Sequence, residues 1–147
     1  MERIKIEIVK LNHAKGLKLP EYATSGSAGM DLVSAVETEI KPMEISLIPT
    51  GLTVAIPEGY EGQIRPRSGM ALKHGITLPN SPGTIDSDYR GEIKVIIQNL
   101  GTESFVINRG DRIAQFIIAP VVRAEWKQVD TLPESVRSTG GFGHTGK

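Results

Sequence analysis

The 147-residue sequence contains no cysteine and only three histidines, which are widely spaced. It can therefore form no disulfide framework, thiol nucleophile or cysteine zinc site, and the histidines are too few and too far apart for a histidine metal cluster. An excess of charge is also missing, because 17 Lys and Arg residues balance 17 Asp and Glu residues. Without a net positive field we expect no nucleic-acid partner, whereas a small anionic ligand remains compatible with the composition.

Long apolar runs are missing as well. No segment approaches the roughly 20 apolar residues of a membrane span. The N-terminus alternates charged and apolar residues between Glu2 and Ile8, unlike the continuous apolar stretch of a signal peptide. We therefore expect a cytoplasmic protein with no membrane partner.

The apolar residues that are present follow the pattern of β-strands. Residues 4–8 and 52–56 alternate, and residues 92–100 and 112–122 form nearly continuous β-branched runs that predict buried strands. Turn residues separate these segments, and only residues 69–74 favour a short helix. Because few segments could supply crossover helices, the pattern indicates an all-β sandwich or barrel instead of a parallel nucleotide-binding sheet.

The segment from Leu78 to Gly91 concentrates the most polar chemistry. Its prolines and glycines predict a tight hairpin that holds two carboxylates, Asp86 and Asp88, together with Tyr89. For this segment alone, an ordinary hairpin with two solvated aspartates is the simpler interpretation.

Three further clusters each have a plain and a functional interpretation. Residues 65–69 place two guanidiniums and a hydroxyl beside a glycine, which suits either a basic surface turn or a phosphate site. Asp31 is a single acid within the apolar run 28–32. Gln115 is an unusually polar member of the strand that follows the charged turn 109–112.

The C-terminal residues are rich in glycine. They also contain Arg137, several hydroxyls and the ring of Phe142, which suits either a frayed terminus or an arm that wraps a polyanion. A P-loop is excluded, because its mechanism needs a following helix and a hydroxyl after the lysine, and the sequence ends at Lys147. We expect a domain over residues 1–130 and an arm over residues 131–147.

In order, these five clusters resemble the five motifs of the homotrimeric deoxyuridine triphosphatase (dUTPase) family. The matching segments are AGMDL at 28–32, RPRSG at 65–69, GTIDSDYRG at 83–91, RGDRIAQ at 109–115 and RSTGGFG at 137–143. The resemblance implies a jelly-roll-like β-barrel with a flexible arm, and a trimer with shared active sites. It also implies Mg²⁺-dependent hydrolysis of dUTP to dUMP and pyrophosphate, which keeps uracil out of DNA and supplies dUMP for thymidylate synthesis.

The resemblance further implies a role for individual residues. Asp86 would activate the water that attacks the α-phosphorus, Tyr89 would exclude a ribose 2′-hydroxyl, and Asp31 would hold a magnesium-bound water. Asp88 is left without a role. The implied substrate-binding residues are Arg67, Ser68, Gly69, Asn80, Gly83, Ile85, Tyr89, Gln115, Arg137, Gly141, Phe142, Gly143 and Thr145.

One position departs from the family pattern, because His144 stands where a small hydroxyl residue is usual. Its imidazole could donate to a phosphate, or it could point into solvent while only its backbone matters. Two other functions remain open. A related deoxycytidine triphosphate deaminase would need a glutamate near the base, and a jelly-roll binding module would not need Asp86, Arg67 and Phe142 together.

Overall fold

The computed structural model describes residues 3–146, and its secondary structure is almost entirely strand. The predicted short helix is confirmed, whereas the first strand begins at Glu7 instead of Ile4 and the last ends at Pro120. The elements are β1 (Glu7–Lys10), η1 (Asn12–Ala14), β2 (Met30–Val33), β3 (Thr38–Ile40), β4 (Ile45–Pro49), β5 (Leu52–Ala55), β6 (Tyr60–Arg65), α1 (Ser68–His74), β7 (Ile76–Thr77), β8 (Gly83–Ile85), β9 (Lys94–Asn99), β10 (Phe105–Ile107) and β11 (Arg112–Pro120).

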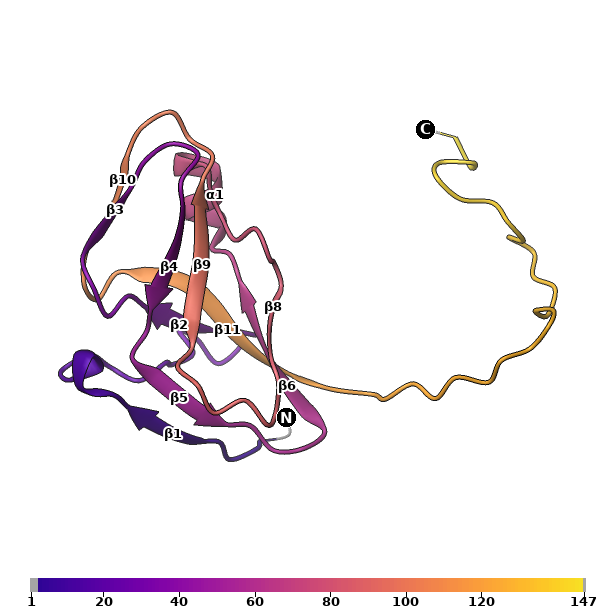
Figure 1. The fold of residues 1–147 in the computed structure, drawn as a ribbon, viewed down its shortest axis with the longest axis horizontal. Coiled ribbons are helices and arrows are strands. Elements are labelled where there is room, and N and C mark those ends of the chain that lie inside the picture. Colours follow the sequence, from indigo (N-terminus) through magenta and orange to yellow (C-terminus); the bar gives the residue numbers. More distant parts are fainter. Residues whose placement is uncertain (1–2, 147) are drawn as a thin grey trace.

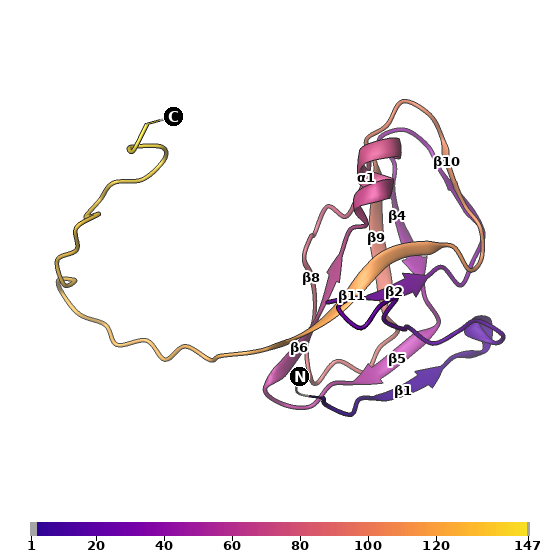
Figure 2. The ribbon, with the colours of Figure 1, turned by 180° about the vertical axis from the view of Figure 1, so that it is seen from behind.

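The strands pair in antiparallel fashion into small sheets that enclose one core. The larger sheet has the order β2-β11-β6-β8 and the next has the order β4-β9-β7, while β1 pairs with β5 and β10 with β3. Figure 1 shows β4 and β9 standing beside β8 and β6, with β5 and β1 crossing below them. From behind, β11 runs diagonally across the barrel between β2 and β6 (Figure 2). The expected all-β, jelly-roll-like architecture is confirmed.

The core consists mainly of isoleucine, valine and leucine side chains from the inner faces of these sheets. Strand β9 shows how it is built, because Val95 and Ile97 are buried while Lys94 is exposed and Ile96 is partly so. The expectation of a wholly buried strand over residues 92–100 is therefore wrong. An apolar run fits a one-sided antiparallel strand equally well when its outer face is also apolar.

The predicted hairpin over residues 78–91 is wrong in its pairing. The segment begins with a turn in which the Ser81 N–H donates to the Leu78 carbonyl at 3.0 Å. It then forms β8, which pairs with β6 in the register Gly62↔Ile85. A second turn follows, in which the Tyr89 N–H donates to the Asp86 carbonyl at 3.1 Å. The order of this segment therefore comes from β6, a strand distant in sequence.

Beyond Pro120 the chain leaves the barrel as an extended arm (Figure 1). The Val121 N–H still donates to the Gly59 carbonyl at 2.8 Å. Further along, Val122 and Trp126 are more than nine-tenths exposed. The division at residues 130 and 131 stays a prediction. In the described residues, no helix is long and apolar enough to cross a membrane.

Asn99 is a buried polar side chain that joins three segments. Its Nδ2 donates to the carbonyls of Ile40 and Glu103, each at 2.8 Å, and its Oδ1 accepts the Gly101 N–H at 2.8 Å. We expect Asn99→Ala to lower the free energy of unfolding by about 3 kcal/mol, because it leaves buried backbone groups without partners. Urea denaturation measures this. The matched control is Gln98→Ala on the outer face of the same strand, which should change stability by less than about 0.5 kcal/mol.

Candidate active site

One face of the larger sheet carries a row of polar side chains. Gln115 of β11 is paired with Asp31 of β2 on one side and with Arg65 of β6 on the other. Directly opposite residues of antiparallel strands point to the same face of a sheet, so these three side chains lie side by side. The register thus brings together residues that are far apart in the sequence.

Asp31 lies between two guanidiniums. Its Oδ1 is 3.5 Å from Nε of Arg67 and its Oδ2 is 3.5 Å from Nη1 of Arg112, and its side chain is only 22% exposed. Arg67 also donates to the Arg112 carbonyl at 3.3 Å. Sequence reasoning missed Arg112, although it stands in the same charged turn as Arg109. The site therefore presents two arginines held by one carboxylate.

Ser68 and Gly69 begin α1, directly after Arg67. Met, Ala and Leu favour this helix, and Gly75 ends it in the left-handed conformation with φ of 66°. A Cβ built on Gly69 would meet no atom within 4 Å. The space above Gly69 is therefore open. A cavity of about 380 Å³ adjoins it and is lined in part by Arg67, Lys73 and Arg112, which gives it a positive character.

Four of the predicted substrate-binding residues and the predicted base line a second cavity of about 460 Å³. A Cβ on Gly83 would lie 3.1 Å from Asn80 Nδ2, so glycine at this position leaves room for the amide. The Tyr89 hydroxyl donates to the Glu92 carbonyl at 2.9 Å, which fixes the ring at the wall of the cavity. The five predicted residues in the lining are Asn80, Gly83, Ile85, Asp86 and Tyr89.

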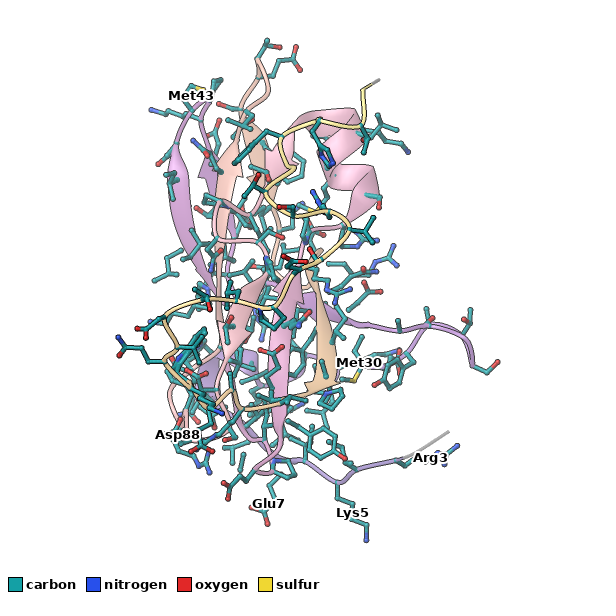
Figure 3. All side chains as sticks on the ribbon, turned by 90° about the vertical axis from the view of Figure 1, so that its right-hand side faces the viewer. Arg3, Lys5, Glu7, Met30, Met43 and Asp88 are labelled. Atoms are coloured by element: carbon teal, nitrogen blue, oxygen red, sulfur yellow. The ribbon has the colours of Figure 1, made fainter. Side chains whose placement is uncertain are left out.

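Asp86 follows β8 and is exposed at the mouth of this cavity. It also borders a larger hollow of about 870 Å³, which Asp88 lines as well. The smaller cavity combines Asp86 with an amide, a phenol and apolar walls, a mixture that is typical of ligand pockets. Figure 3 places Asp88 near the outer edge of the molecule. Within the described residues, no three His, Cys, Asp or Glu side chains form a metal cluster.

Figure 2 shows the arm that carries the predicted residues curving away from the barrel, and none of these residues lines either cavity. Arg137 Nε donates to the Gly140 carbonyl at 2.8 Å, and the His144 ring covers Gly140 so closely that a Cβ there would collide with it. The Phe142 side chain is fully exposed and its φ is +52°. The arm is thus a series of local turns that presents an aromatic ring to solvent.

A family model described as dUTPase matches residues 15–146, which is most of the chain. The chain belongs to the dUTPase family. Two relatives carry the name deoxyuridine 5'-triphosphate nucleotidohydrolase. The protein from Maricaulis maris is 55% identical over 150 aligned positions, with 99% of each chain covered. The protein from Rickettsia felis is 59% identical over 143 positions, with 96% of each chain covered. The family resemblance of the sequence is therefore confirmed.

Solved dUTPase structures also superpose on this one. A dUTPase variant of Staphylococcus bacteriophage 80alpha with dUpNHpp has a TM-score of 0.89 at 29% identity, covering 97% of this chain and 99% of that chain. A dUTPase variant from phage phi11 of S. aureus, described with a structural Mg(II) ion, has a TM-score of 0.78 at 28% identity, covering 87% and 98%. The dUTPase fold thus extends over nearly the whole chain.

The open space at Gly69 leads to a prediction that separates stability from binding. In Gly69→Ala we expect stability to be unchanged or to rise by up to about 1 kcal/mol, because alanine favours helix. We expect KM for dUTP to rise about tenfold if phosphates approach this backbone, since the methyl group would displace them. Thermal unfolding and steady-state kinetics measure both. The matched control is Gly26→Ala, whose Cβ also meets nothing within 4 Å and which lies outside both cavities. Unchanged KM in Gly69→Ala would contradict the phosphate assignment.

Proposed function

We propose that this dUTPase-family chain hydrolyses dUTP to dUMP and pyrophosphate, with Asp86 as the base. The cavity that combines Asn80, Tyr89 and Asp86 carries the proposal. The Asn80 amide could bind the edge of a base, the Tyr89 ring could pack against a deoxyribose, and the Asp86 carboxylate could activate water. The relatives' names and the dUpNHpp of the bacteriophage enzyme support this substrate class.

The proposed reaction is a displacement at the α-phosphorus. The water oxygen forms a bond to this phosphorus, the bond to the bridging oxygen of the β-phosphate breaks, and pyrophosphate leaves. The water proton passes to the Asp86 carboxylate. Asn80 and the backbone of Gly83 and Ile85 would read the uracil edge, and cytosine would leave buried partners unpaired. Tyr89 would occupy the space that a ribose 2′-hydroxyl needs.

The cationic face of the molecule suits the triphosphate. Arg67 would pair with phosphate oxygens, the open backbone at Ser68 and Gly69 would approach them closely, and Gln115 would bind from the adjacent strand. Mg²⁺ fits this donor set only through water, because the Asp31 carboxylate could accept a hydrogen bond from a metal-bound water and the ion prefers to keep waters and phosphate oxygens. When bound, the ion would neutralise charge on the phosphate chain.

The remaining parts of the site would come from association and from the arm. The outward-facing Ile45 and Leu47 of β4 are 58% and 56% exposed, which supports burial against another copy in the predicted homotrimer. The arm residues would then close over the nucleotide, with Arg137 on the terminal phosphate and Phe142 on uracil, helped by Gly141, Gly143 and Thr145. His144 keeps its two interpretations, and the cytoplasmic location stays a prediction.

The role of Asp86 is tested by Asp86→Asn, in which the amide can no longer take up the proton. We expect dUTP affinity within a few-fold of wild type and a loss in kcat of about a thousandfold. Calorimetry and pyrophosphate release measure the two quantities. Asp88→Asn is the matched control, two residues further on, and should keep wild-type turnover.

Incubation with dCTP should release neither ammonia nor pyrophosphate. A wild-type chain that binds dUTP without turning it over would overturn the proposed function.

The role of the arm is tested by ending the chain after Val136. Because residues 137–146 are almost all exposed, we expect no change in melting temperature. Turnover should fall by about a hundredfold, since the Arg137 guanidinium and the Phe142 ring that would contact the nucleotide are missing. A chain that ends at Thr145 is the control, because it keeps every arm residue named above. Full turnover in the shorter chain would make the arm a frayed terminus, and sedimentation of both chains reports whether the trimer forms.

A further inference from the structure

Glu92 lines the same cavity as Tyr89. Its side chain is only 15% exposed. Both of its contacts converge on one carboxylate oxygen, because Oε1 accepts the Gly51 N–H at 2.8 Å and lies 2.5 Å from Nε2 of His13. The other oxygen is 4.0 Å from Nζ of Lys94. The carboxylate thus ties η1 and the turn before β5 to the wall of the cavity.

The backbone of the same residue holds the tyrosine. The Glu92 carbonyl accepts the Tyr89 hydroxyl at 2.9 Å. Between the two residues, a Cβ on Gly91 would collide with the Tyr89 ring and hydroxyl, so the ring lies directly over the glycine. The position of the phenol therefore depends on where the peptide of Glu92 lies.

Glu92 and its neighbour Ile93 are held by different kinds of contact. Ile93 is fixed by its own backbone, since its N–H donates to Leu52 at 2.8 Å and its carbonyl accepts both the N–H and the hydroxyl of Thr50. Glu92 is anchored through its side chain to Gly51, which has a φ of +69° and where a Cβ would collide with Ala14. The Glu92 carbonyl and the Ile93 N–H belong to one planar peptide group, which is held on one side by the bond to Leu52 and on the other by the Glu92 side chain. Loss of the carboxylate would leave this peptide held from one side only.

The charges around Glu92 favour the ionised carboxylate. Burial raises its pKa, but the hydrogen bonds of His13 and the Gly51 N–H, with the charges of His13 and Lys94, outweigh this, so the pKa lies below its usual value. The anchor is therefore a carboxylate at neutral pH.

We propose that Glu92 is a positioning residue that sets the sugar selectivity of the cavity, by anchoring the peptide whose carbonyl holds the Tyr89 hydroxyl. The inference rests on the proposed function, in which Tyr89 excludes ribonucleotides. The reach of the side chain matters more than its charge, since both contacts use a single oxygen that an amide can also provide.

Three substitutions separate reach from charge. Glu92→Ala removes the anchor, Glu92→Asp keeps the charge but falls one methylene short of Gly51, and Glu92→Gln keeps the oxygen without the charge. We expect the ratio of kcat/KM for dUTP over UTP to fall about tenfold in the alanine and aspartate variants, through KM more than kcat. The glutamine variant should stay within about twofold of wild type, because its amide oxygen accepts both contacts.

The matched control is Glu44→Ala. Glu44 also accepts a backbone N–H, that of Lys41 at 2.7 Å, but it lies next to Met43 at the end of the barrel opposite Asp88 (Figure 3). Its removal should leave the dUTP to UTP ratio unchanged. Melting temperatures of all variants show which are folded. If Glu92→Ala does not fold, Glu92→Asp provides the test.

A double-mutant cycle tests whether Glu92 acts through the tyrosine hydroxyl. In Tyr89→Phe the hydroxyl is missing, so adding Glu92→Ala should change the ratio much less than it does in the wild type. Folded Glu92→Ala and Glu92→Asp variants with wild-type selectivity, or fully additive effects in the cycle, would overturn the inference. If wild type does not hydrolyse dUTP, the proposed function fails instead, so the two failures are distinct.

Discussion

The pairing of β11 with two neighbours at once is the constraint on which the rest of the site depends. Gln115 stands opposite Asp31 on one strand and opposite Arg65 on the other. A shift of one residue in either register would turn these side chains to the other face of the sheet and put apolar residues in their place. The buried neighbours Ala114 and Phe116 prevent such a shift, because they would be exposed by it. The polar face is thus held in place by the hydrophobic core behind it.

Buried residues also lie behind the second cavity. Strand β6 places β8 beside it, and Gly62 at one end of that pairing has no room for a side chain, because a Cβ there would collide with the Phe116 ring. The buried Phe116 ring thus packs directly against the strand that orders β8, while Asp86 and Tyr89, which follow β8, are exposed. Rigid elements behind and accessible groups in front are the usual arrangement of a binding site on a β-scaffold.

Much of this arrangement could be predicted from local sequence alone. The helix at Ser68–His74 follows from helix-forming residues before Gly75, and the five clusters resemble motifs of the family to which the comparisons assign the chain. What local patterns miss is long-range pairing. The segment 78–91 looks like a self-contained hairpin, but its strand partner is β6. The contact of Arg112 with Asp31 and the anchoring of Glu92 by Gly51 also join distant segments, and a solitary glutamate after a glycine has no pattern that distinguishes it from a solvated one.

The arm that leaves the barrel at Pro120 has a consequence for how closure would respond to conditions. Arg137 and Phe142 are covalently tethered, so in the proposed closure a bound nucleotide would meet them at an effective concentration set by the length of the connecting chain, on the order of millimolar for a flexible tether. As long as the predicted trimer stays associated, dilution of the protein would not weaken such an encounter. A proteolytic cut anywhere in the exposed stretch between Val121 and Val136 would abolish it at once, with the barrel intact. The exposed arm would thus make activity, but not folding, sensitive to proteases.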